Sequence, residues 1–189
     1  MQDFHAFIDE VLVDEQRIEK RIGELGAQIS RDYTGEELLI VCLLRGGITF
    51  TADLTRILTI PHTLDCMSLS SYGVGHYASS GNVRVNLDLM TNIEGLNVLL
   101  VEDIVDSGRT LAHVLQMLRT REPKSLKVCV LLDKKYRREV PVEVDYVGFD
   151  VPDKYVFGYG IDIDEHYRHL PFIASADMQK YVKENKPIK

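Results

Sequence analysis

The chain has 189 residues and a mass of 21.5 kDa, which is enough for one well-buried core and too little for two ordinary domains with a linker. Hydrophobic residues make up 45% and charged residues 27%, so disorder or a fibrous repeat does not describe the whole chain. The formal net charge of −7 disfavours a surface devoted to duplex nucleic acid, because such a surface needs cations that displace counterions. A small anionic ligand can still bind in a local positive pocket.

The cysteines and the hydropathy pattern indicate a cytoplasmic protein. Cys42, Cys66 and Cys129 form no C-x-x-C pair, and two of them lie in strongly apolar runs, as buried reduced thiols do. The longest unbroken apolar run covers residues 38–44 and is far shorter than the ~20 residues of a membrane helix. The first residues are acidic rather than basic, so we expect neither secretion nor membrane insertion.

The first part of the chain predicts outer helices followed by a buried strand. Two segments, residues 4–11 and 18–29, carry helical spacing and are separated by a cap at Asp14. Residues 38–44, LLIVCLL, lack alternation, as does a strand that is covered on both faces. An RGG turn and an amphipathic stretch through Leu58 follow, which predicts a second helix.

The next segment predicts a two-stranded ribbon. Residues 64–70 and 83–89 both show period-two patterning. They are joined by residues 71–82, a long tip rich in Gly, Ser and Tyr. Loops of this length are uncommon unless they bind or cover a ligand, so we expect a flexible lid there.

The remaining elements complete an α/β fold. Residues 98–104 and 126–132 repeat the buried-strand pattern, and residues 111–118 between them place their apolar side chains on one helical face. From residue 140 onward short apolar segments alternate with turns, which predicts an irregular cap or extra strands. Strands that alternate with helices form a central parallel sheet flanked by helices, with ligands beyond the carboxyl ends of the strands.

The stretch VEDIVDSGRT joins the end of a buried strand to the start of a helix. Free amides at a helix N-terminus, together with the hydroxyls of Ser107 and Thr110, suit a phosphate group. Glu102 and Asp103 would repel that phosphate but can accept hydrogen bonds from sugar hydroxyls, as an acid does in dinucleotide folds. The stretch therefore predicts a ribose 5-phosphate site. The alternative is a capped helix after a strand that ends in solvated acids.

This combination resembles the 5-phosphoribosyl-1-diphosphate (PRPP) motif of the type I phosphoribosyltransferases, and further blocks narrow the resemblance to the hypoxanthine-guanine phosphoribosyltransferases. The blocks occur in matched order between about residue 38 and residue 172 and read LLRGG, SSYG, VEDIVDSGRT, LLDKK and VGFDVPDKYVFGYGIDIDEHYRHLP. Ser107 and Arg109 stand where many relatives carry Thr and Lys, and both keep the hydroxyl or the charge. The resemblance implies a single domain, residues 1–189, with a hood built from the N-terminal and C-terminal segments.

The resemblance also implies how the sugar phosphate and a metal ion are bound. Glu102 and Asp103 correspond to the acids that bind the ribose hydroxyls of PRPP and help to place Mg²⁺. Asp162 corresponds to an acid that meets Mg²⁺ on the pyrophosphate side, and Asp106 to a general base near N7 of the purine. The 5′-phosphate loop comprises Asp106, Ser107, Gly108, Arg109 and Thr110.

The pyrophosphate end of PRPP is assigned to the residues after the first buried strand. Arg45, Gly46 and Gly47 match a loop that binds pyrophosphate in relatives and often holds a cis non-proline peptide. Arg168 matches a cation for the leaving pyrophosphate. Without the neighbouring blocks, the RGG segment alone predicts no more than a plain turn.

Lys134 matches the lysine that donates to the O6 atom of the purine in this family. An ammonium group offers only hydrogen-bond donors, so it suits a 6-oxopurine and not the amino group of adenine. The alternative is that Lys134 belongs to a solvated basic run, KKYRR, as most surface lysines do.

The rest of the purine site and the lid are implied in the same way. Tyr155 matches an aromatic ring that stacks on the purine, and Val156 a residue whose backbone carbonyl recognises the base edge. Side chains near Tyr155 and Asp162 decide recognition at position 2 of the base. Ser71 and Tyr72 match a pair that folds over the reacting sugar. An aromatic residue followed by valine is otherwise an ordinary core pattern.

These assignments imply a magnesium-dependent phosphoribosyltransferase of purine salvage that uses PRPP with hypoxanthine or guanine. Two alternatives stay open, a xanthine-preferring enzyme and a non-catalytic PRPP-sensing regulator. A regulator of that kind would carry a nucleic-acid-binding appendage or a basic face, and the acidic sequence shows neither. We expect no nucleic-acid or membrane partner, and the family resemblance implies a homodimer or homotetramer.

Overall fold

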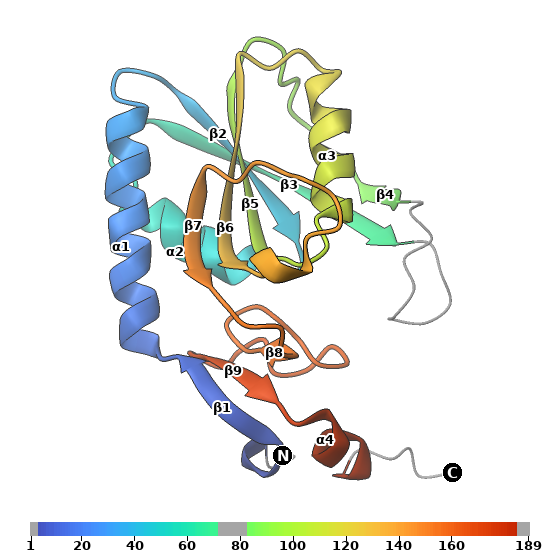
Figure 1. Cartoon of the computed structure of the whole chain (residues 1–189). Helices are drawn as coiled ribbons and strands as arrows, with labels where there is room; N and C mark the ends of the chain where they lie inside the picture. The colour runs from blue at the N-terminus through green and yellow to red at the C-terminus, as the bar shows by residue number, and fades with distance from the viewer. Residues whose placement is uncertain (1–3, 72–82, 185–189) are drawn as a thin grey trace.

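The computed structural model describes residues 4–71 and 83–184, and its centre is a six-stranded sheet. The strands are β2 (Leu38–Leu44), β3 (His62–Ser71), β4 (Val83–Leu87), β5 (Asn97–Val105), β6 (Ser125–Asp133) and β7 (Tyr146–Asp150). Their order across the sheet is β4-β3-β2-β5-β6-β7, and only the β3–β4 pair is antiparallel (Figure 1). The predicted α/β class with a largely parallel sheet is therefore confirmed.

Helices cover both faces of this sheet. α1 (Glu15–Asp32) and α2 (Ile48–Ile57) pack on one face, and α3 (Arg109–Arg119) packs on the other (Figure 1). Consecutive residues of β2 enter opposite clusters: Leu38 and Ile40 contact the α1–α2 side, while Leu39 and Val41 contact the α3 side. Because both faces of the strand are buried, its sequence is continuously apolar instead of alternating.

The N-terminal segment differs from the prediction. Asp14 caps α1 as expected, and its carboxylate accepts a hydrogen bond from the Arg17 amide at 2.9 Å. The predicted helix over residues 4–11 was wrong, because the chain forms a 3₁₀ turn, η1 (Phe4–Ala6), and then β1 (Ile8–Val13). This strand pairs with β9 (Ile173–Ala176), so a partner distant in sequence overrides the helical spacing.

A second, three-stranded antiparallel sheet forms a hood over the strand ends. Its order is β1-β9-β8, with β8 spanning Val156–Phe157, and α4 (Met178–Glu184) follows it. Both ends of the described chain lie in this hood, at the bottom of Figure 1. Phe7 anchors it, because its ring lies 5.5 Å from Phe157, 5.4 Å from Tyr167 and 5.0 Å from Tyr181, centroid to centroid.

The predicted ribbon and the C-terminal segments fall into place around these two sheets. β3 and β4 form the expected antiparallel pair, but β3 is also a parallel neighbour of β2, so the ribbon is the edge of the main sheet. The tip, residues 72–82, lies outside the described residues. The region after residue 140 supplies β7 to the main sheet and β8 and β9 to the hood. Among the described residues, no helix is long and apolar enough to cross a bilayer.

The direction of winding reverses between β2 and β5. From β2 the chain crosses through α2 to β3 on one side, and from β5 it crosses through α3 to β6 on the other side. Loops after the two central strands therefore separate, which opens a crevice at their carboxyl ends.

The central strands should carry much of the stability. Leu99 in β5 is fully buried, so Leu99→Ala should lower the free energy of unfolding by about 2–5 kcal/mol through lost contacts and a residual cavity. Leu64→Ala removes the same atoms from a side chain that is 55% exposed. It should change the free energy of unfolding by less than about 0.5 kcal/mol. Urea unfolding of both variants measures the difference, and equal losses would contradict this account of the core.

Candidate active site

A cleft of about 500 Å³ opens at the carboxyl ends of β2 and β5. This volume is within the usual range for small-molecule sites. Residues from the two central strands, the β3–β4 edge and the hood line it: Leu44, Arg45, Gly46, Ser68, Leu69, Ser70, Asn86, Glu102, Asp103, Asp162 and Arg168. The cleft thus brings together the predicted metal residues and most of the predicted pyrophosphate residues.

The loop after β2 passes very close to the acids at the end of β5. The Leu44–Arg45 peptide is cis. A Cβ atom added to Gly46 would lie 1.6 Å from Oδ2 of Asp103, so only glycine fits there. Gly47, the third residue of the predicted loop, donates to the Leu43 carbonyl at 3.1 Å and begins α2.

Glu102 and Asp103 form an acid pair on the cleft wall. The Asp103 amide donates to Oε1 of Glu102 at 3.1 Å, and the Ile104 amide donates to Oδ1 of Asp103 at 2.7 Å. Burial, followed by the negative charge of Asp103, raises the pKa of Glu102 well above its usual value. Two acids held this close favour a ligand that brings positive charge or hydrogen-bond donors.

The turn after β5 presents the N-terminus of α3. Gly108 precedes the helix with a φ of +82°, and a Cβ atom there would lie 2.7 Å from the Val140 carbonyl. Its position offers no side-chain cap to the first amides of α3. The Ser107 carbonyl accepts from the amides of Glu139 and Val140 at 3.0 and 3.1 Å, which fixes the turn. The Arg109 amide donates to Oγ of Ser107 at 3.4 Å, and the amides that follow it at this rigid helix start suit an anion.

Two predicted residues of this turn, Arg109 and Thr110, open α3. The guanidinium of Arg109 forms an ion pair with Glu139 at 2.6 Å. Its charge is therefore paired with an acid in this structure, and its backbone amide is the first amide of α3.

Lys134 lies directly after β6 and is only 6% exposed. Its amide donates to the Val105 carbonyl at 3.0 Å, and its Nζ atom lies 3.7 Å from Oδ2 of Asp106. The alternative of a solvated surface lysine is therefore wrong. Buried ammonium groups are rare without a partner, and the neighbouring acid is the predicted general base.

Asp106 is also approached by two arginines. Nε of Arg137 lies 3.0 Å from Oδ1 of Asp106, and the same guanidinium pairs with Asp153 at 3.0 Å. Arg138 donates to the backbone carbonyl of Asp106 at 3.2 Å. Oδ1 of Asp106 is buried, yet among the described residues it accepts no hydrogen bond of good geometry. An acceptor in this state is available to a ligand that carries a proton.

The hood contributes the predicted aromatic residue. Tyr155 is 39% exposed, and its carbonyl accepts from the Ala176 amide at 2.8 Å, which ties it to β9. Val156 is buried at the start of β8. Ser71 is the last residue of β3, and nothing is described of its side chain; Tyr72 lies outside the described residues.

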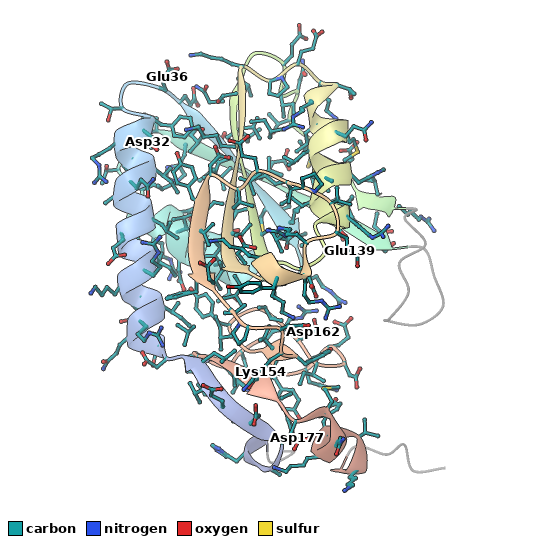
Figure 2. The ribbon with its side chains drawn as sticks, in the orientation of Figure 1. Asp32, Glu36, Glu139, Lys154, Asp162 and Asp177 are labelled. Carbon is teal, nitrogen blue, oxygen red and sulfur yellow. The ribbon has the colours of Figure 1, made fainter. Side chains whose placement is uncertain are left out.

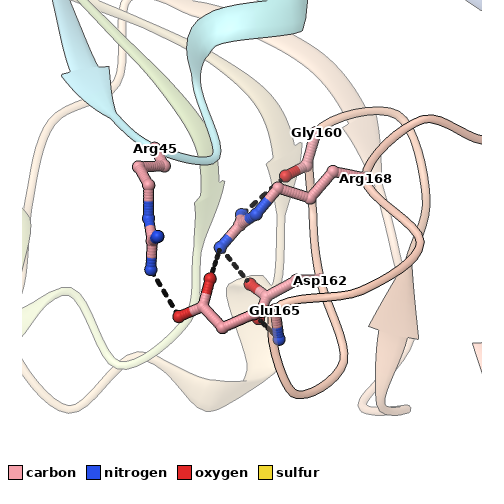
Figure 3. Close-up of polar contacts among 5 residues, drawn as sticks. All are labelled: Arg45, Gly160, Asp162, Glu165 and Arg168. Atoms are coloured by element: carbon pink, nitrogen blue, oxygen red, sulfur yellow. Dashed lines mark hydrogen bonds and ion pairs between the residues drawn. The ribbon is translucent and has the colours of Figure 1, made fainter.

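A charged cluster lies at the end of the cleft where pyrophosphate is predicted to bind (Figure 3). Arg168 lies 2.8 Å from Asp162 and 3.1 Å from Glu165, and it donates to the Gly160 carbonyl at 2.7 Å. Glu165 also pairs with Arg45 across the cleft edge. The hydrogen bond from Arg168, and then the charge of Arg45, lower the pKa of Glu165.

The acids of the cleft fit a hard divalent cation that is shared with a ligand. Among the described residues no group of three or more His, Cys, Asp and Glu side chains could hold a metal ion. Glu102 and Asp103 nevertheless offer carboxylate oxygens side by side on the cleft wall, which are ligands that Mg²⁺ prefers. Mg²⁺ commonly takes one or two carboxylates and completes its shell with phosphate oxygens and water.

Several residues of the site were missed by sequence reasoning. Arg137 and Arg138 were included only in a solvated basic run, although both contact Asp106. Glu165 carried no expectation, although it links the two predicted pyrophosphate arginines. The only available signal was charge density next to matched blocks, which does not say which acid meets which base.

Comparisons with known proteins show the family of the chain. The sequence model of the phosphoribosyl transferase domain matches residues 10–166. A hypoxanthine phosphoribosyltransferase of Salmonella typhimurium is 51% identical over 167 residues, which cover 87% of this chain and 93% of that protein. A hypoxanthine-guanine phosphoribosyltransferase of Dictyostelium discoideum is 45% identical over 178 residues, 92% of this chain and 98% of that one. A crystal structure of a hypoxanthine phosphoribosyltransferase from Staphylococcus aureus matches with a TM-score of 0.89 and 40% identity, covering 94% and 96% of the two chains.

The raised pKa of Glu102 should make the stability of the protein depend on pH. Because its folded-state pKa lies above 4.5, the folded protein keeps a proton that the unfolded chain releases, and stability falls as the pH rises from that value towards the folded pKa. Glu102→Gln cannot ionise, so its free energy of unfolding should exceed that of the wild type increasingly over this range. Urea unfolding in the absence of divalent cations measures it. Equal stabilities at acid and neutral pH would show an ordinary carboxyl.

Proposed function

Because the chain belongs to the phosphoribosyl transferase domain family and, within it, to the hypoxanthine(-guanine) phosphoribosyltransferases of purine salvage, we propose that it joins hypoxanthine and guanine to PRPP. In this pentosyl transfer, N9 of the base forms a bond with C1 of the ribose while the bond from C1 to the pyrophosphate oxygen breaks. The products are the nucleoside 5′-monophosphate and pyrophosphate. We propose that the whole chain, residues 1–189, acts as one phosphoribosyltransferase domain.

The observation that carries the proposal is the order of charges along the strand ends. Arg45 and Arg168 lie at one end of the cleft, Glu102 and Asp103 line its wall, and the uncapped start of α3 follows β5. PRPP has the same order, with pyrophosphate, a ribose diol and a 5′-phosphate. We therefore assign pyrophosphate to the arginines and to the loop of Gly46 and Gly47, with the Gly46 amide as donor, since the Gly47 amide donates to the Leu43 carbonyl. The 5′-phosphate is assigned to residues 106–110.

We propose that Glu102 and Asp103 hold Mg²⁺ together with oxygens of PRPP, and that Asp162 meets the ion on the pyrophosphate side. Bound there, the ion would neutralise negative charge that develops on the departing pyrophosphate. Arg168 would help to neutralise the same negative charge, since the Gly160 carbonyl holds its guanidinium at the cleft. Because Gly160 and Asp162 both hold the Arg168 guanidinium, this side chain would need little reorganisation during the reaction.

The purine is assigned to the space beside Asp106, Lys134 and Tyr155. The ammonium of Lys134 would donate to O6, and the ring of Tyr155 would stack on the base. Asp106 would accept the proton that leaves the imidazole ring of the purine as N9 bonds to C1. The Val156 carbonyl would contact the base edge, and Asp162 lies on the side of position 2.

Two further assignments complete the proposal. Ser71 and Tyr72 belong to a lid, residues 71–82, that would cover the sugar and keep water from C1 during transfer. We also propose a cytoplasmic homodimer or homotetramer without a nucleic-acid or membrane partner. Size-exclusion chromatography with light scattering distinguishes the two assemblies.

An initial-rate panel tests the function. With PRPP and Mg²⁺, we expect turnover of hypoxanthine and guanine, and we expect adenine to be rejected because its exocyclic group cannot accept from Lys134. Faster use of xanthine would favour the xanthine-preferring alternative. No turnover with any oxopurine would refute the proposal that the protein is an enzyme, and the PRPP-sensing regulator would be the remaining alternative.

Lys134→Ala should lower kcat/KM for hypoxanthine by about 10- to 100-fold, the usual effect of losing a hydrogen bond from a charged donor. Lys135→Ala is a matched control, because its ammonium is 58% exposed and pairs with Asp150 at 2.9 Å. The control should keep nearly full activity. Equal effects of the two substitutions would contradict the role of Lys134 in recognising O6.

A further inference from the structure

Glu165 bridges the two arginines at the pyrophosphate end of the cleft. In Figure 3 its carboxylate lies between their guanidinium groups, with one oxygen on each. Oε1 accepts from NH2 of Arg45, and Oε2 accepts from NH2 of Arg168 at 3.1 Å. An anion that offers one oxygen to each of two cations is the arrangement that a phosphate group would also provide.

The two arginines are held differently. Arg168 has further acceptors at the Gly160 carbonyl and at Asp162, so it stays in place without Glu165. Among the described residues, Glu165 is the one acid that forms an ion pair with Arg45, whose side chain is 65% exposed. The charge of Arg45 is therefore paired with Glu165 at the edge of the cleft in this structure.

The turn that carries Glu165 does not need the carboxylate. Ile163 and His166 exchange backbone hydrogen bonds at 3.2 and 2.9 Å, and the Glu165 amide donates to Oδ2 of Asp162 at 2.8 Å. Asp164 and Glu165 occupy the two central positions with φ of +49° and +69°. Glycine or asparagine would adopt this conformation at lower cost, so the glutamate stands at a position that local structure disfavours. The ion pairs of the Glu165 side chain, and not the conformation of the turn, therefore account for a glutamate at this position.

We propose that Glu165 is an internal competitor for pyrophosphate, which occupies Arg45 and Arg168 between turnovers and is displaced when PRPP or pyrophosphate binds. The inference rests on the proposed function, since that function assigns pyrophosphate to these arginines. Exposed ion pairs contribute about 0.2–1 kcal/mol each, so a ligand with several negative charges displaces the carboxylate readily. Glu165 thus weakens pyrophosphate binding and favours product release.

A different role would have the opposite effect. If Glu165 served to orient the arginines for the ligand, its loss would leave Arg45 without a fixed direction and would weaken binding of pyrophosphate. The sign of the change in affinity therefore separates competition from orientation.

Titration calorimetry with inorganic pyrophosphate and Mg²⁺ provides the test. Glu165→Gln keeps the size and the backbone of the turn, and we expect it to bind pyrophosphate about two- to fivefold more tightly than the wild type at low ionic strength. The gain should shrink at high salt, because exposed charges are screened.

Glu36→Gln is the control for net charge. Glu36 pairs with Lys124 at 2.7 Å, is similarly exposed, and lies near the top of Figure 2, well away from Asp162. This variant should bind pyrophosphate like the wild type. An unchanged or weaker affinity of Glu165→Gln, or an equal gain in the control, would overturn the proposal.

Kinetics supply a second readout. The KM for PRPP should fall and inhibition by pyrophosphate should strengthen in Glu165→Gln, while the KM for hypoxanthine stays unchanged. Calorimetry needs no turnover, so the two proposals fail separately. An inactive wild type would refute the proposed function, whereas the pyrophosphate titration would still decide the role of Glu165.

Discussion

The backbone at Gly46 is in close contact on two sides, with the Asp103 side chain and with the backbone of Gly160. On one side the Asp103 carboxylate would be 1.6 Å from a Cβ atom at Gly46. On the other side a Cβ atom at Gly160 would lie 2.3 Å from the Gly46 carbonyl, and Gly160 has a φ of +98°. Two glycines thus let the hood loop, the loop after β2 and the end of β5 stack as three layers of backbone and acid. These close contacts place Gly46 and Asp103 in the wall of the cleft.

This stacking places opposite charges side by side without letting them neutralise one another fully. Glu102 and Asp103 come from the main sheet, whereas Arg168 is held by the hood through Gly160 and Asp162. Burial and mutual repulsion raise the pKa of Glu102, so the acid pair destabilises the folded protein at neutral pH. Such a cost is typical of functional sites, where stability is lower than an uncharged cleft would allow.

The main sheet could be predicted from the sequence because a strand that is buried on both faces is a continuous run of apolar residues. Residues 38–44 are predicted as a strand and form β2 with the same bounds, since residues 38–41 and Leu43 pack alternately into the clusters on its two faces. The hood could not be predicted in this way. Phe7 and Ile8 have spacing that fits a helix, but β1 exists through its pairing with β9 and through the aromatic contacts of Phe7. Neither partner is visible in a local window.

The site shows the same division between local and distant information. The acids and the turn of VEDIVDSGRT are consecutive, so their chemistry could be read together, and the resemblance to a family supplied Lys134 and Arg168. The ion pairs that set the direction of each charge join distant segments, as in the pair of Arg45 with Glu165, which are 120 positions apart. A basic run in the sequence shows its charge but not its partners, so it predicts a solvated Arg137, although Arg137 pairs with Asp106 and Asp153. Motifs therefore identify the groups that meet a ligand, while the tertiary structure decides which of those groups are already engaged by the protein itself.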